Sequence, residues 1–179
     1  MAHIGVYVVG ICEPMNPGGH GAWGMSFTRE GDEQKHVGGY LGRKKEMTEI
    51  YALVFGCVQA ARFVKHGWQD GDVATISTTS DYIAKLLKGE EVSEYPDTAL
   101  LVKRFRSALH GLQHTIGVVR KDWVKDADKA ARMAVFEAIG KYPARGHMQD
   151  GVWDTDTPAP KPVTVHERKT TLDDFGGSP

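Results

Sequence analysis

The chain contains few cysteines, no long apolar run and almost no excess charge. Cys12 and Cys57 are the only cysteines among its 179 residues, which excludes a disulfide scaffold and a cysteine-based zinc cluster. No apolar stretch approaches the roughly 18 residues of a membrane helix, so we expect no membrane partner. The net charge of −1 argues against a strongly basic nucleic-acid coat protein. The N-terminus lacks the basic-then-apolar pattern of a secretory leader, so we expect a cytoplasmic protein.

Glycine and proline are unevenly distributed along the chain. Ten of the 21 glycines fall within residues 1–42, a pattern typical of short strands joined by tight turns. Five of the eight prolines fall within residues 143–179, where they are interspersed with polar residues. We therefore predict a folded domain over residues 1–142 and a Pro-rich, extended C-terminal tail over residues 143–179.

Hydrophobic periodicity predicts nine elements within the domain. Strands are expected over Ile4–Ile11, Ala22–Thr28, Gln34–Leu41, Asp72–Thr78 and Thr115–Val119, and helices over Thr48–His66, Ser80–Lys88, Pro96–Leu112 and Val124–Ile139. Three sequential strands followed by helical crossovers predict an α/β fold of order β-β-β-α-β-α-α-β-α, with one mixed five-stranded sheet flanked by helices.

Four short segments match the motifs of one known family. Residues 12–19 read C-E-P-M-N-P-G-G at the end of the first predicted strand, and residues 48–53 read T-E-I-Y-A-L at the start of the first helix. Residues 77–81 (S-T-T-S-D) end the fourth strand, and residues 126–131 (D-A-D-K-A-A) open the last helix. In sequence and order these segments resemble ribonuclease HI of the archaeal-like type. The resemblance implies a ribonuclease H-like fold over about residues 4–140 of this chain.

The resemblance also implies a reaction and a set of site residues. In that family, four carboxylates hold two Mg²⁺ or Mn²⁺ ions, which activate water to cut the RNA strand of an RNA–DNA hybrid. The matching positions here are Val9, Glu49, Thr79 and Asp128. Glu49 and Asp128 are thus the retained catalytic and metal-binding candidates, whereas valine cannot bind a cation and threonine offers one neutral hydroxyl. The formal charge falls from −4 to −2, so we predict that two-metal nuclease activity is lost or very weak.

Two alternatives stay open for these carboxylates. Glu13 and Asp81 lie near the two lost positions in sequence and are possible substitutes in a rewired, magnesium-dependent ribonuclease H. Conversely, Glu49 and Asp128 each lie in the first turn of a predicted helix, where a carboxylate stabilises the helix dipole without any catalytic role.

Backbone amides and basic side chains are the candidates for nucleic-acid binding. The resemblance places the turn of Asn16, Gly18 and Gly19 near the phosphates of a hybrid, although the same residues also suit a plain tight turn. Basic side chains before the first helix and on the third helix provide phosphate contacts or simply solvated surfaces: Arg43, Lys44, Lys45, Lys103, Arg104 and Arg106.

These observations favour a pseudoenzyme kept as a binding module. Its partner is expected to be nucleic acid, as an RNA–DNA hybrid or structured RNA, or a protein that contacts the 143–179 tail, for example through the acidic and aromatic residues 172–175. One alternative is an active ribonuclease H with rewired carboxylates, and another is a structural component of a larger assembly. We expect no cofactor, or Mg²⁺ or Mn²⁺ if the protein is active.

Overall fold

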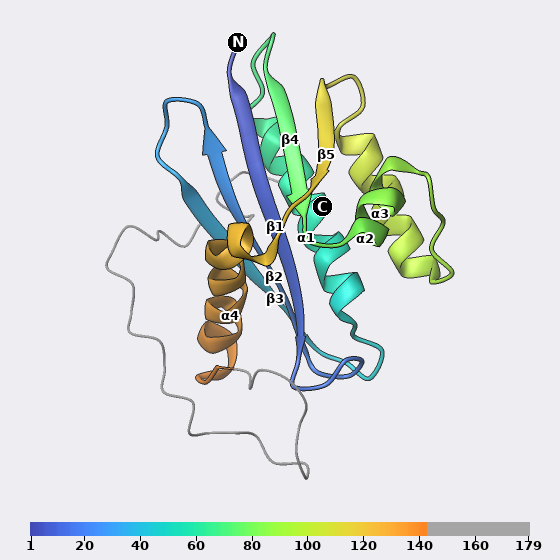
Figure 1. The fold of residues 1–179 in the computed structure, drawn as a ribbon. Coiled ribbons are helices and arrows are strands. Elements are labelled where there is room, and N and C mark those ends of the chain that lie inside the picture. The colour runs from blue at the N-terminus through green and yellow to red at the C-terminus, as the bar shows by residue number, and fades with distance from the viewer. Residues whose placement is uncertain (143–179) are drawn as a thin grey trace.

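The computed structural model describes residues 1–142 (Figure 1). The predicted tail of residues 143–179, with its docking segment, lies outside the described residues. The strands are β1 (His3–Glu13), β2 (His20–Arg29), β3 (Lys35–Arg43), β4 (Val73–Thr78) and β5 (His114–Val118). The helices are α1 (Glu49–His66), α2 (Asp81–Lys88), α3 (Pro96–Ala108) and α4 (Lys125–Ile139), with a short 3₁₀ turn η1 (Lys121–Val124) before α4.

All five strands form one mixed sheet in the order β3-β2-β1-β4-β5. The hairpins β1–β2 and β2–β3 are antiparallel, whereas β4 lies parallel to β1 and β5 lies parallel to β4. The α/β fold class and the element order predicted from the sequence are therefore confirmed. The α3 helix is the one clear difference, because it ends at Ala108 rather than Leu112. The chain turns there through Gly111, which adopts a positive φ of 79°.

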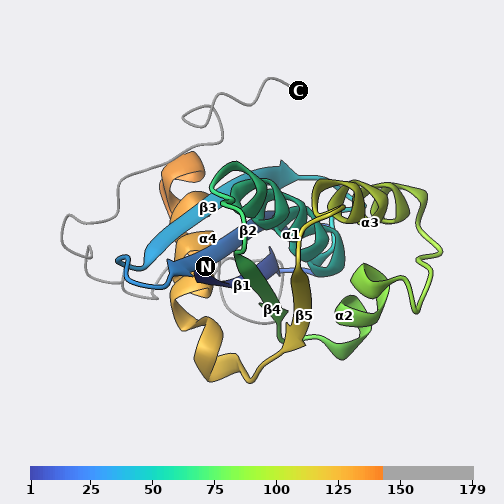
Figure 2. The same ribbon diagram turned by 90° about the horizontal axis from the view of Figure 1, so that it is seen from above.

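Helices cover both faces of the sheet (Figures 1 and 2). Helices α1, α2 and α3 share the larger core with one face, which includes Ile4, Val54 and Phe105. Helix α4 packs alone on the other face, over a smaller core that includes Val9 and Ala131. Among the described residues, no helix is long and apolar enough to span a membrane.

Glycines allow the helices to approach the sheet closely. A Cβ built on Gly24 of β2 would stand 1.9 Å from the Ala127 carbonyl oxygen of α4, and one on Gly38 of β3 would stand 2.3 Å from that of Ala130. These two glycines are cross-strand partners, so they form a shallow bed on which the α4 backbone rests. On the other face, a Cβ on Gly10 of β1 would stand 2.2 Å from the Leu53 backbone nitrogen of α1.

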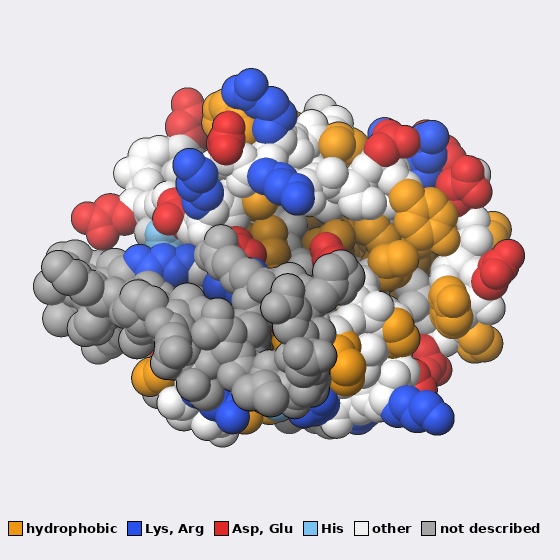
Figure 3. Space-filling model, turned by 60° about the horizontal axis from the view of Figure 1, so that its bottom comes forward, with side chains coloured by type: hydrophobic (Ala, Val, Ile, Leu, Met, Phe, Trp, Pro, Cys, Tyr) orange, Lys and Arg blue, Asp and Glu red, His pale blue; other side chains and the backbone are white. Residues whose placement is uncertain are grey.

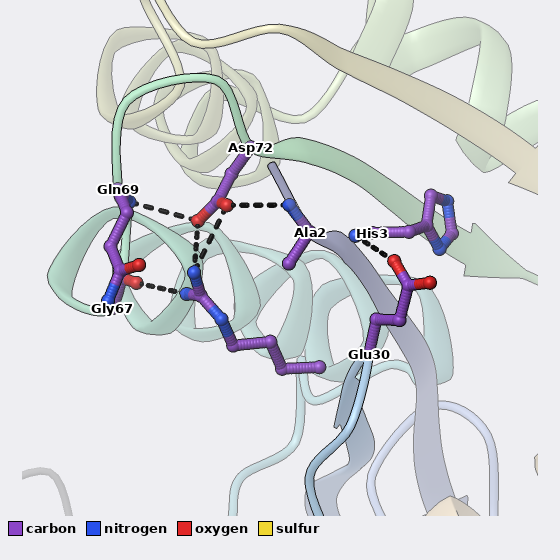
Figure 4. Close-up of polar contacts among 7 residues, drawn as sticks. Ala2, His3, Glu30, Gly67, Gln69 and Asp72 are labelled. Carbon is purple, nitrogen blue, oxygen red and sulfur yellow. Dashed lines mark hydrogen bonds and ion pairs between the residues drawn. The ribbon is translucent and has the colours of Figure 1, made fainter.

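A buried carboxylate ties the start of β1 to the loop before β4 (Figure 4). Asp72, 1% exposed, accepts hydrogen bonds from the backbone amides of Ala2 and Gln69 and forms an ion pair with Arg29. Arg29 also donates to the Gly67 carbonyl. Burial acts to raise the pKa of Asp72, but these amides and the guanidinium outweigh burial and hold the pKa below its ordinary value.

Candidate functional site

The candidate site is a cavity of about 740 Å³ where β1, α1, the end of β4 and α4 meet. The four positions singled out by the sequence, Val9, Glu49, Thr79 and Asp128, all line it. Glu13 lines it as well. Figure 3 brings the lower end of Figure 1 forward, and acidic, basic and hydrophobic side chains are mixed where that face is visible.

The turn after β1 fixes the start of α1. The Asn16 side-chain oxygen accepts a hydrogen bond from the Glu49 backbone amide at 3.1 Å, and the Gly18 amide donates to the Met47 carbonyl at 2.8 Å. The buried Cys12 thiol donates to the same Met47 carbonyl at 3.2 Å. Thr48 caps the helix. Residues 12–19 therefore hold the start of α1, and with it Glu49, at the edge of the cavity.

The Glu49 carboxylate is close to one other acidic group of the cavity, Glu13, and to one basic group, Lys121. Partial desolvation raises the pKa of Glu49, and the nearby Glu13 carboxylate raises it further. Lys121 opposes this rise. No ion pair involves the Glu49 carboxylate within residues 1–142.

Arg132 binds the other two candidate carboxylates. Its guanidinium forms two hydrogen bonds with the Glu13 carboxylate, one of them at 2.9 Å, and its Nε donates to Asp128 Oδ2 at 3.0 Å. The side chain of Arg132 is 11% exposed, that of Glu13 19% and that of Asp128 28%. Solvent therefore screens these contacts only partly. Burial acts to lower the pKa of Arg132, but the two carboxylates outweigh burial and raise it. Glu13 and Asp128 are thus already bound to a cation that belongs to the chain.

Val9 and Thr79 complete the lining with uncharged groups. Val9 is 9% exposed and packs in the smaller core with Ile11, Ala127 and Ala131. Thr79 follows the last residue of β4 and is half-buried. The floor of the cavity is therefore apolar at the position of Val9.

Asp81, proposed from the sequence as a substitute carboxylate, is not among the residues that line this cavity. It lies in the first turn of α2, where its exposed carboxylate forms an ion pair with Lys85 at 2.9 Å. Of the two proposed substitutes, the structure brings only Glu13 to the site.

The basic residues proposed from the sequence fall into two groups. Arg43 donates to the Gly18 carbonyl, and the exposed Lys44 and Lys45 lie in the loop that leads to Glu49. Lys103 and Arg106 instead line a separate groove of about 600 Å³ between α3 and the segment after α2, and the exposed Arg104 lines neither cavity. The structure therefore does not bring the α3 group into the Glu49 cavity.

The amides of Gly18 and Gly19 have partners within the chain. The Gly18 amide donates to the Met47 carbonyl, and the Gly19 amide donates to the Met15 carbonyl at 3.0 Å. The turn that includes Asn16 is thus held by hydrogen bonds within the chain, one inside the turn and one to Met47.

Sequence reasoning missed a third basic group, which lines the cavity itself: Lys121, Lys125, Lys129 and Arg132. The first three recur every four residues, a spacing that places successive side chains on one side of a helix. This four-residue spacing was the signal from which the sequence could have predicted a basic group on one side of the last helix. The cavity lining includes four acidic residues, Glu13, Glu49, Asp122 and Asp128, so the acids and bases balance in number.

The donor set does not suit a pair of divalent ions. Within residues 1–142, no group of three or more His, Cys, Asp and Glu side chains is placed to hold a metal ion. Two of the four acids bind Arg132, and the position of Val9 offers no oxygen. The residues present therefore do not fit the two-metal centre that the resemblance implies.

No family model matches the chain, and no curated protein matches it. Solved structures do. The RNase H1 of the halophilic archaeon Halobacterium salinarum aligns with a TM-score of 0.66 and 20% identity over 75% of this chain and 98% of that chain. LC11-RNase H1, isolated from compost, aligns with a TM-score of 0.68 and 14% identity over 78% and 99%. The structure of LC11-RNase H1 in complex with an RNA/DNA hybrid aligns with a TM-score of 0.66 and 15% identity, over 76% of this chain and 99% of that chain.

Proposed function

Starting from the ribonuclease H-like fold of this chain, we propose that it is a pseudoenzyme that binds an RNA–DNA hybrid without cutting it. The binding surface is the cavity lined by Glu49, together with the neighbouring loop of Arg43, Lys44 and Lys45. The ligand class is supported by LC11-RNase H1, which shares the fold and whose structure contains an RNA/DNA hybrid.

The observation that carries the proposal is the ion-pair group of Arg132. Two-metal phosphodiester cleavage requires several carboxylates that are free to bind two adjacent cations. Here the Arg132 guanidinium binds Glu13 and Asp128, and Val9 fills one of the four positions that the resemblance assigns to a carboxylate. Of the four positions that the resemblance singles out, Glu49 is the one whose carboxylate forms no ion pair within residues 1–142, and Thr79 contributes only a neutral hydroxyl.

A cleavage assay tests the proposal directly. A labelled RNA–DNA hybrid is incubated with the full chain in Mg²⁺ and then in Mn²⁺, beside a Glu49→Gln variant. We expect no product, or an equal trace from both proteins. Cleavage by the wild-type chain that disappears in Glu49→Gln overturns the proposal and establishes the rewired nuclease.

Binding is measured on the same hybrid by electrophoretic shift at low salt, in parallel with duplex RNA and single strands. We expect the hybrid to shift. If no nucleic acid shifts at low salt, the binding proposal fails, and a role as a structural part of an assembly or as a protein-binding module takes its place.

A further inference from the structure

Three lysines form a row along the rim of the Glu49 cavity. Lys121 belongs to η1, Lys125 is the first residue of α4 and Lys129 lies one turn further on, about 6 Å along the helix axis from Lys125. All three line the cavity, and Lys121 and Lys125 are exposed. We name Lys121, Lys125 and Lys129 the lysine row.

The first turn of α4 carries Lys125 together with two carboxylates, Asp126 and Asp128. The N-terminus of a helix carries a partial positive charge, so lysine at this end is disfavoured by the helix itself. Moreover, Val124 stands at the cap position and provides no side-chain hydrogen bond to the first turn. Asp128 of the same turn is bound to Arg132 and Asp126 does not line the cavity, so on the cavity side the helix dipole and the lysine charge add and attract anions.

The row has charge to offer a ligand. Within the described domain, no ion pair involves these three lysines. Glu13 and Asp128 are bound by Arg132 instead. The remaining acids of the cavity are Glu49 and Asp122, which face three lysines. Together with Arg132, the three lysines balance the four acidic side chains of the cavity. Its net charge is therefore close to zero without a bound ion. In a two-metal site, divalent ions would have to supply that positive charge.

We propose that the lysine row binds backbone phosphates of a nucleic acid seated in the cavity, with no divalent ion between protein and phosphate. The proposal rests on the nucleic-acid-binding function proposed above and assigns it a contact surface and a metal requirement. Lysine is a common phosphate ligand that acts as a point charge, so the contact is electrostatic and independent of base sequence.

The test compares two triple variants of the full chain that carry the same net charge. Lys121→Gln/Lys125→Gln/Lys129→Gln removes the row. The control, Lys35→Gln/Arg62→Gln/Lys65→Gln, removes three exposed charges elsewhere: Lys65 lies ~24 Å from Glu49 along α1, and Lys35 begins β3. A single cooperative thermal transition in each variant, well above the assay temperature, confirms that both variants fold.

Affinity for a labelled RNA–DNA hybrid is measured by fluorescence anisotropy in EDTA, between about 50 and 200 mM salt. For the wild type and the control we expect steep salt dependence. For the row variant we expect the slope of log affinity against log salt to shrink by roughly 2 to 3, at about 0.9 per lost phosphate contact. Affinity at the lowest salt should fall by at least about tenfold.

The outcomes separate the two proposals. If the wild type binds no nucleic acid at about 50 mM salt, with or without Mg²⁺, both proposals fail. If it binds and the row variant matches the control in slope and affinity, the lysine row is refuted while the binding function stands. If EDTA abolishes wild-type binding and Mg²⁺ restores it, the metal-free contact is refuted.

Discussion

Replacing Arg132 by methionine should destabilise the fold by about 2–3 kcal/mol. Breaking a fully buried ion pair costs about 3–5 kcal/mol, because the remaining charge is left without a partner. The Glu13 and Asp128 side chains are 19% and 28% exposed, so water compensates part of that loss. We therefore expect about 2–3 kcal/mol rather than the full cost of a buried pair. Methionine keeps most of the side-chain volume, which leaves the lost charge as the main change.

Thermal unfolding measures this effect. At about 3 °C per kcal/mol for a domain of this size, Arg132→Met should melt about 6–9 °C below wild type. The matched control is Arg62→Met on the exposed side of α1, which should stay within about 0.5 kcal/mol. The double variant Glu13→Gln/Arg132→Met should recover much of the loss, because both members of the main pair are then neutral.

The same variant tests why the site does not suit a metal ion. Without Arg132, the carboxylates of Glu13, Glu49 and Asp128 are all available, and we expect Mg²⁺ to raise the melting temperature. At ten times its dissociation constant the ion adds about 1.4 kcal/mol, or about 4 °C. The wild type should show no such shift. Equal Mg²⁺ shifts in both proteins, or an Arg132→Met variant as stable as wild type, would refute the role assigned to Arg132.

Two further predictions concern the fold that supports the site. Gly24→Ala should lower the free energy of unfolding in urea by about 1–3 kcal/mol, because the new Cβ would stand 1.9 Å from the Ala127 carbonyl oxygen. The control Gly5→Ala should be tolerated, because its Cβ would have nothing within 4 Å. Equal losses in the two variants would contradict this packing. Asp72→Asn should be less stable than wild type at neutral pH. Because the pKa of Asp72 is lowered in the folded state, its stabilising effect is present above its unfolded value of about 3.9 and is lost as the pH falls through the folded pKa. The difference between the two proteins should therefore shrink in acid, and a difference that is the same at every pH would contradict the Arg29 pairing.

Much of the fold was predictable because local signals agree with one another. The helix predicted over Thr48–His66 has its N-cap at Thr48 and ends at His66, and the helix predicted from Ser80 has Ser80 as its cap. Strand boundaries moved by one or two residues, since hydrophobic alternation fades gradually at strand ends. The helix predicted to reach Leu112 was too long, because the propensity of apolar residues there is overridden by the turn at Gly111.

The candidate site was only half predictable. Motif spacing indicated the four positions that meet in the cavity, yet it could not indicate the partner of Glu13. Arg132 lies 119 residues further along the chain, and their contact depends on where α4 crosses the sheet. That crossing is determined by tertiary packing against Gly24 and Gly38, which no local pattern reports. The lysine spacing was visible in the sequence, but its relation to the cavity was not.

Val9 and Arg132 both lie where α4 packs on the sheet beside the cavity. Ala127 and Ala131 of α4 pack on the sheet around Val9. The floor of the cavity is therefore apolar at this position, where Val9 is 9% exposed. A carboxylate placed there would lose its hydration, and the guanidinium of Arg132 is already bound to Glu13 and Asp128. The exposed Lys121 and Lys125 therefore carry positive charge that a phosphate can reach, whereas the position of Val9 offers a metal ion no ligand.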